Sequence, residues 1–165
     1  MRAKQMLKAT ERKAVSPTRL RARGRRIVLL ACAATKLAQR AAAEDLYISH
    51  LFRLALAYGR SLEPDAIYIL SAKHGLVALD TMLDPYNLTL KDLSSREVKE
   101  WSAEVLRELA QKADLATDHF IVLAGDAYRR FLVPKLADWE APLGNLPIGK
   151  QLQRLIELLH GKQLR

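Results

Sequence analysis

The sequence predicts a compact three-layer α/β domain with a mostly parallel central sheet, preceded by a basic, flexible N-terminal tail. Three short apolar runs that each end in polar residues are typical of buried parallel strands. Helical segments lie between these runs, and the resulting β–α–β–α–β–α order is that of a sheet covered on both faces. The chain has 165 residues, which suits one domain over residues 27–165 whose core needs no disulfide or metal.

The first half of the domain is expected to hold two strands and one helix. The first strand is expected over residues 27–31, followed by a connector with some helical character over residues 36–44. The apolar residues of 49–62 recur on one helical face. A second strand is expected over residues 66–70. Residues 76–90 are expected to be an irregular excursion, and connections of this length are often functional.

The second half has clearer boundaries. The motif Ser-Ser-Arg-Glu at residues 94–97 is a capping box and begins a helix that we expect to end near Ala113. A third strand is expected over residues 119–123, with a short helix over residues 126–132 after it. Gly149 begins a last amphipathic helix.

The positive charge of the chain is concentrated in its tail. Residues 1–26 contain ten Lys and Arg and one acidic residue, whereas the remainder has 17 basic and 17 acidic residues. Such a segment would bind DNA or RNA through phosphate contacts without reading the base sequence. A solvated extension, or codons upstream of the true start, would explain the same composition equally well. An Arg-rich organelle presequence has a similar composition, but nothing else in the sequence supports one.

The composition also limits location and cofactors. No apolar run approaches the roughly 18 residues that span a bilayer, so no membrane association is expected. The single cysteine, Cys32, cannot form an internal disulfide and suits a reducing compartment. No signal-peptide pattern begins at Met1, and a cytoplasmic protein is expected. No Cys/His cluster has zinc spacing, so we expect neither a metal nor another cofactor.

The polar residues after the three strands make one candidate site, because ligands of open α/β sheets bind beyond the carboxyl ends of the strands. Lys36 would hold an anion or act as a nucleophile, although an exposed surface lysine is the commoner case. Cys32 is more typical of core packing than of reactivity. Lys73, His74 and Gly75 combine an anion donor, a group that titrates near neutral pH and a tight turn. A structural histidine is the alternative.

The third strand exit and the last helix offer weaker candidates. At Gly125 the backbone amides could bind an anion close to Tyr128, whereas Asp126 is more typical of a plain helix cap. Gly149 and Lys150 combine a helix start with a lysine in the same way. Neither segment has the spacing of a P-loop or of a dinucleotide fingerprint.

Three further residues lie on the connections. Tyr47 is either a core residue with a satisfied hydroxyl or a ligand contact, and Ser49 is a natural N-cap. Tyr86, in the excursion, would stack on a base or bridge two segments. No Ser-His-Asp triad or pair of catalytic carboxylates can be recognised, so the sequence leaves open whether the protein is an enzyme.

Together these segments resemble a small prokaryotic and phage family of unknown function, a compact relative of the YaaA peroxide-stress proteins. The resemblance covers roughly residues 27–152 and rests on five motifs in order: Cys32-x-x-x-Lys36, Asp45-Leu-Tyr47-x-Ser49, Ile69–Leu76 with Asp84-Pro-Tyr86, Leu123–Tyr128 and Pro147–Gln151. His74 stands where the YaaA proteins have tyrosine, and Ala34-Thr35 precedes Lys36 where a Gly-Lys-like pair is expected. The DNA-binding insertion of that family has no counterpart here. A fainter similarity to the catalytic domain of archaeosine synthase, which attaches lysine to a deazaguanine in tRNA, implies a nucleobase pocket.

Two functions from different classes follow as expectations. The first is a pocket for a nucleobase, nucleotide or related anion, in a protein that modifies nucleic acids or nucleobases. Lys36, Lys73 and Lys150 would then hold anionic groups, Tyr47 or Tyr86 would stack or donate a hydrogen bond, and His74 would move a proton. The second is a non-catalytic nucleic-acid-binding or oxidative-stress accessory protein that acts through the tail.

Overall fold

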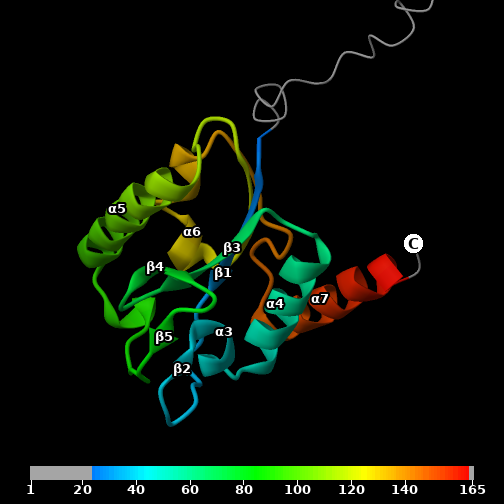
Figure 1. The fold of residues 1–165 in the computed structure, drawn as a ribbon, viewed down its shortest axis with the longest axis horizontal. Coiled ribbons are helices and arrows are strands. Elements are labelled where there is room, and N and C mark those ends of the chain that lie inside the picture. The colour runs from blue at the N-terminus through cyan, green and yellow to red at the C-terminus, as the bar shows by residue number, and fades with distance from the viewer. Residues whose placement is uncertain (1–23, 164–165) are drawn as a thin grey trace, which may run out of the picture.

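The computed structural model describes residues 24–163, and the basic tail lies outside this range except for its last three residues. A five-stranded sheet in the order β4-β3-β1-β6-β7 forms the centre (Figure 1). The strands are β1 (Arg26–Ala31), β3 (Ala66–Ser71), β4 (Gly75–Ala78), β6 (His119–Leu123) and β7 (Asp138–Glu140). All neighbours pair in parallel except β3 and β4. The predicted α/β class with a mostly parallel sheet is confirmed.

Helices cover both faces of the sheet. Helices α4 (His50–Ser61) and α7 (Ile148–Gln163) lie on one face, and α5 (Ser95–Lys112) lies on the other (Figure 1). Alternate residues of β1 point to opposite faces of the sheet. Val28 and Leu30 pack toward α4 and α7, and Ile27 and Leu29 pack toward α5. All four are fully buried. This alternation explains why the strand has a continuous apolar sequence.

Helices α4 and α5 begin where the sequence predicts. The Ser49 hydroxyl accepts a hydrogen bond from the Phe52 amide and caps α4 (3.1 Å). Ser94 and Glu97 form a reciprocal capping box at the start of α5. Both caps satisfy amides that a helix leaves without partners in its first turn.

The excursion after β3 is more regular than expected. Residues 75–78 form β4, which folds back on β3 as an antiparallel hairpin through a turn with Gly75 at φ 72°. Residues 82–83 form β5 (Met82–Leu83), which pairs with β2 (Ala41–Ala42) in a separate two-stranded sheet. The expectation of an irregular segment was therefore wrong for these residues. The apolar residues Leu76 and Val77 are buried in the hairpin.

Other short elements also differ from the prediction. The connector between β1 and α4 contains β2 and the single-turn helix α3 (Ala43–Leu46). The short helix after β6 is α6 (Asp126–Arg129), shorter than predicted, and a 3₁₀ turn follows at Val133–Lys135. Strand β7 was not predicted, because its three residues are all exposed and lack an apolar pattern.

The topology places a switch point between β1 and β6. The chain leaves β1 toward β3 on one side, and it leaves β6 toward β7 on the other. Crevices outside the carboxyl ends of strands at such points are where open α/β sheets bind ligands. Within residues 24–163, no helix is long and apolar enough to cross a membrane.

Candidate functional site

Tyr86 is the centre of a chain of hydroxyl groups at the carboxyl end of β3. Its phenol oxygen lies 2.6 Å from that of Tyr47 and 2.7 Å from the hydroxyl oxygen of Ser71. Tyr47 and Ser71 are buried, with exposed fractions of 1% and 0%. Burial raises the pKa of the Tyr47 phenol and that of the Tyr86 phenol above the ordinary value. The tyrosines therefore remain protonated near neutral pH and act as hydrogen-bond donors.

The ammonium group of Lys36 lies against this cluster. Its Nζ is 4.3 Å from the centroid of the Tyr86 ring and 5.7 Å from that of Tyr47. A β-bridge between Lys36 and Tyr47 holds the two chain segments together. Nζ donates a hydrogen bond to the Ala34 carbonyl oxygen (3.2 Å), and no carboxylate among the described residues forms an ion pair with it.

Partial burial shifts the pKa of this lysine. Desolvation lowers the pKa of Lys36 below its ordinary value, and the proximity of Cys32 opposes this effect. The two tyrosine rings attract the ammonium form through their π-electrons. The result is a cation whose nearest neighbours are aromatic and neutral. Such a cation is available to an incoming anion.

The turn Lys73-His74-Gly75 brings an imidazole into contact with the Tyr86 ring. The His74 amide donates to the Ser71 hydroxyl (3.0 Å), and its ring lies 5.3 Å from the Tyr86 ring in an edge-to-face arrangement. Lys73 Nζ lies 5.8 Å from the Tyr86 centroid. Desolvation, followed by the charge of Lys73, lowers the pKa of His74. A neutral imidazole, which can accept a proton, is therefore favoured near pH 7.

Helix α5 holds this turn in place through two side chains that the sequence did not single out. Trp101 Nε1 donates to the Ser71 carbonyl oxygen (2.8 Å), and Glu108 accepts from the Leu76 amide (3.1 Å). Ser71 itself was also missed. The available signal was its position as the polar residue that ends the apolar run of β3.

A second contact crosses the switch point. Cys32, directly after β1, lies with its Sγ 3.3 Å from the phenol oxygen of Tyr128 in α6. The Tyr128 ring packs edge-to-face on Trp101 (5.7 Å), and burial raises the pKa of its phenol. Residues from the exits of β1 and β6 thus meet, as the parallel arrangement predicts.

Among the described residues, no hydrogen bond or ring contact joins the remaining candidates to the Tyr86 cluster. Gly125 is the N-cap residue of α6, and a methyl group there would meet open space. Asp126 pairs with Arg130 (3.0 Å). In the described part of the chain, no hydrogen bond or ring contact joins Gly149 or Lys150 to Tyr86, and both are exposed.

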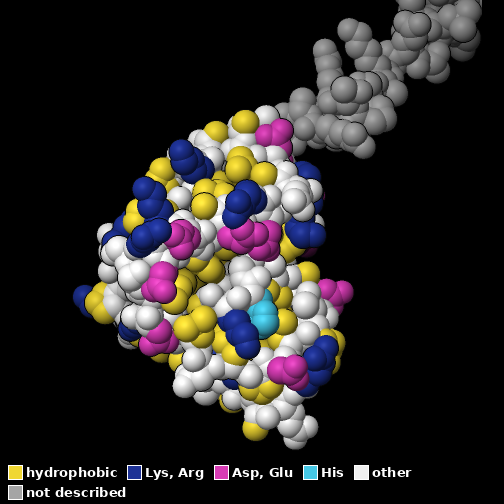
Figure 2. All heavy atoms as spheres, turned by 90° about the vertical axis from the view of Figure 1, so that its left-hand side faces the viewer, with side chains coloured by type: hydrophobic (Ala, Val, Ile, Leu, Met, Phe, Trp, Pro, Cys, Tyr) yellow, Lys and Arg dark blue, Asp and Glu magenta, His cyan; other side chains and the backbone are white. Residues whose placement is uncertain are grey.

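The surface around α5 and β4 carries mixed charge. Figure 2 shows acidic and basic side chains interspersed over this face, with one histidine against a basic side chain. Single-sign patches attract polyanions, whereas interspersed charges do not. This face of the folded part therefore carries no extended patch of one sign (Figure 2).

The fold and the site define the class of the protein: a doubly covered α/β sheet with lysine, tyrosine and histidine side chains at the carboxyl ends of its strands. Within this class the chain belongs to DUF6884, a family of unknown function, whose model matches residues 27–157. The sequence-based resemblance to a family of unknown function is confirmed at this level. No curated protein and no solved structure gives a match.

Proposed function

We propose that the carboxyl-end site binds a nucleobase, nucleotide or related anion, and that the protein modifies nucleobases or nucleic acids. The observation that carries the proposal is the Lys36 ammonium, which has no carboxylate partner in residues 24–163 and lies 4.3 Å from the Tyr86 ring. An anionic ligand would supply the missing countercharge. Lys73, 5.8 Å from the same ring, would add a second cation.

The surrounding groups suit proton transfer. His74, whose pKa is lowered, would accept a proton from the ligand, and the hydroxyl chain through Ser71, Tyr86 and Tyr47 would relay protons to or from the site. The phenols would donate hydrogen bonds rather than stack. Tyr47 is 1% exposed, and Lys36 already lies over the Tyr86 ring.

The motif order supports a more specific proposal. We propose that this family is a compact relative of the YaaA proteins, and the Cys32-x-x-x-Lys36 exit suggests a more distant kinship with the catalytic domain of archaeosine synthase. In this proposal the family shares with the YaaA proteins the strand-exit lysine and the turn after the second strand, with His74 in place of their tyrosine, and it shares with archaeosine synthase only the Cys32-x-x-x-Lys36 exit. The kinship favours a nucleobase over other anions.

Ligand-induced thermal stabilisation tests the site. The full chain would be titrated with purine and pyrimidine bases, 7-deazaguanines and their nucleotides. At a ligand concentration of 100 times Kd, binding contributes about 2.7 kcal/mol to the free energy of unfolding and raises Tm. Lys36→Ala should abolish the shift and leave the Tm of the free protein unchanged. The matched control is Lys99→Ala, at an exposed position of α5. If no base or nucleotide shifts Tm, the proposal is wrong.

The charge distribution favours a second candidate function. The ten basic residues within positions 1–26 would bind DNA or RNA, and affinity would fall steeply with salt. The test measures fluorescence anisotropy of labelled DNA and RNA at two salt concentrations, with the full chain and a variant lacking residues 1–23. The deletion keeps Arg26, whose amide is bonded to Asp65 (2.7 Å). Equal affinity of the two proteins would exclude this function.

A further inference from the structure

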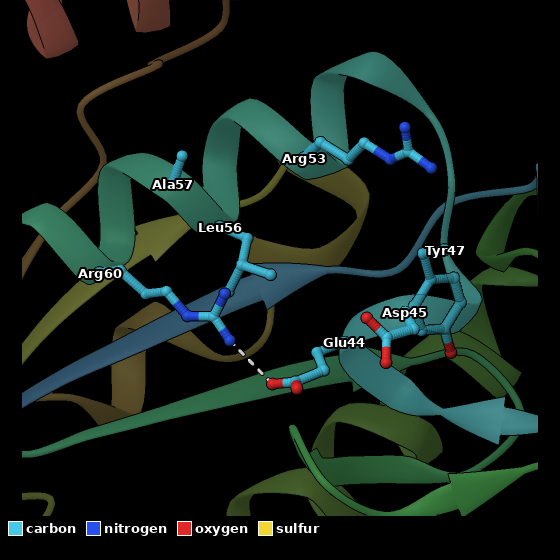
Figure 3. A pocket seen from close by; sticks show the side chains of 7 residues that line it. All are labelled: Glu44, Asp45, Tyr47, Arg53, Leu56, Ala57 and Arg60. Carbon is cyan, nitrogen blue, oxygen red and sulfur yellow. Dashed lines mark hydrogen bonds and ion pairs between the residues drawn. The ribbon is translucent and has the colours of Figure 1, made fainter.

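A pocket of about 340 Å³ lies between α3 and α4, and Tyr47 forms part of its lining (Figure 3). Helix α3 supplies the carboxylates of Glu44 and Asp45, and α4 supplies the guanidinium groups of Arg53 and Arg60. The pocket is near the lower end of the range of about 300–1,000 Å³ that is typical of small-molecule sites.

The four charges of the pocket are not equivalent. Arg60 and Glu44 form an ion pair at 2.8 Å, which the dashed line in Figure 3 marks. Arg53 and Asp45 have no side-chain hydrogen bond or ion pair within residues 24–163. In Figure 3 the Arg53 guanidinium extends along the rim away from Arg60, and the Asp45 carboxylate lies on the α3 side. The pocket thus presents one free cation and one free anion.

Apolar groups complete the lining. Leu56 and Ala57 of α4 and the ring of Tyr47 lie between the charged groups. Leu56 and Tyr47 are anchored in the core, with exposed fractions of 7% and 1%. This part of the wall is apolar and suits a compact aliphatic group.

We propose that this pocket binds a small zwitterion, an α-amino acid with an aliphatic side chain. Its carboxylate would pair with Arg53 in the bidentate geometry that guanidinium groups favour. Its ammonium would pair with Asp45, and its side chain would lie against Leu56 and Ala57.

Charge balance selects the zwitterion over simpler ions. An isolated anion at Arg53 would share the pocket with the free carboxylate of Asp45, and an isolated amine at Asp45 would share it with Arg53. Like charges in one site are unfavourable. Only a ligand with both groups pairs both side chains. This site is distinct from the carboxyl-end site and does not depend on the function proposed there.

The test uses L-leucine and two analogues that each lack one charge. Isothermal titration of the full chain should give saturable binding of L-leucine with a Kd of about 1 mM or tighter. 3-Methylbutylamine, which lacks the carboxylate, and 4-methylpentanoate, which lacks the ammonium, should each bind at least about tenfold more weakly. Arg53→Gln and Asp45→Asn should weaken leucine binding by a similar factor.

The controls separate the pocket from the remainder of the surface. Arg96→Gln removes an exposed arginine from α5, on the opposite face of the sheet, and should leave leucine binding unchanged. Arg53 and Asp45 are exposed, so the melting temperature of each free variant should equal that of the parent protein. No saturable binding of leucine at roughly 10 mM, well above that Kd, would overturn the proposal. Equal binding of leucine and its two analogues, or an equal loss in Arg96→Gln, would do the same.

Discussion

The phenol oxygens of Tyr47 and Tyr86 lie 2.6 Å apart although 39 residues separate them in the sequence. Tyr47 precedes α4, and Tyr86 lies in the excursion at residues 76–90, after β4 and β5. Their hydrogen bond joins two connecting segments at the end of β3. The Ser71 hydroxyl is the third group of this hydrogen-bonded cluster. The candidate site therefore depends on this contact for its shape, and four predictions follow from the groups around it.

Replacement of Tyr86 by phenylalanine should destabilise the protein. The change removes the hydroxyl that links Tyr47 and Ser71, and it leaves buried polar atoms with fewer partners. The expected loss is about 1–3 kcal/mol in the free energy of unfolding, measured by urea denaturation. Tyr68→Phe is the matched control, because the Tyr68 hydroxyl has no hydrogen-bond partner in the described part of the chain. Equal effects of the two substitutions would contradict the proposed role of Tyr86.

Replacement of Gly75 by alanine should also destabilise the protein, for a different reason. Gly75 has φ 72°, and an added Cβ would lie 2.7 Å from Oε1 of Glu108. The left-handed backbone conformation alone costs about 1–3 kcal/mol for a residue with a side chain.

Gly149 supplies the opposite control for this prediction. It lies in α7, where a Cβ meets nothing within 4 Å, so Gly149→Ala should stabilise the protein by up to about 1 kcal/mol. Chemical denaturation of the two variants should therefore give shifts of opposite sign. An unchanged free energy of unfolding in Gly75→Ala would contradict this prediction, because it would show that the turn adjusts to a side chain without cost.

The lowered pKa of His74 predicts how stability changes with pH. Because the pKa is lower in the folded state, unfolding allows His74 to take up a proton at pH values just below the ordinary pKa of about 6.5. The contribution of His74 is therefore complete above pH about 6.5 and is lost as the pH falls toward the folded pKa. Between pH 7.5 and pH 5, roughly the range in which a histidine titrates, His74→Asn should lose less stability than the parent. Gln111→Asn, at an exposed position of α5 whose side chain does not titrate, is the control and should follow the parent curve.

Lys36 should react with amine reagents at a lower pH than exposed lysines do. Desolvation lowers its pKa, so a larger fraction of the uncharged, nucleophilic amine is present at a given pH. Reductive methylation followed by peptide mass spectrometry measures the pH at which each lysine reaches half of its maximal rate. This pH should be lower for Lys36 than for Lys91, which is exposed. Coincident curves for the two residues would show that the aromatic neighbours compensate for burial.

The central strands were predictable because each is buried on both faces. A strand such as Phe120–Leu123 then has no polar position to interrupt the apolar run. The cap at Ser94 was predictable because its partners lie within one helical turn. Both signals are local, and neither depends on the remainder of the chain.

The missing elements depend on long-range packing. Strand β7 consists of Asp138, Trp139 and Glu140, which are all exposed, and it is a strand only because β6 provides a parallel edge. Trp101 and Glu108 contact the β3–β4 hairpin at residues that are 30 and 32 positions away in the sequence. The sequence shows α5 as an amphipathic helix, but it does not show which of its polar groups reaches the sheet.

The position of β1 has a consequence for synthesis on the ribosome. This strand is made first among the five, yet its neighbours arrive much later: Arg26 meets Asp65 after 39 residues, and Arg25 meets Asp118 after 93 residues. At a translation rate of about 5–20 residues per second, the apolar run Ile27–Leu30 waits several seconds for β6. The nascent chain therefore exposes this apolar segment during elongation. The pairing of β1 with β6 is a late, slow step, and a chaperone could bind the exposed segment before it.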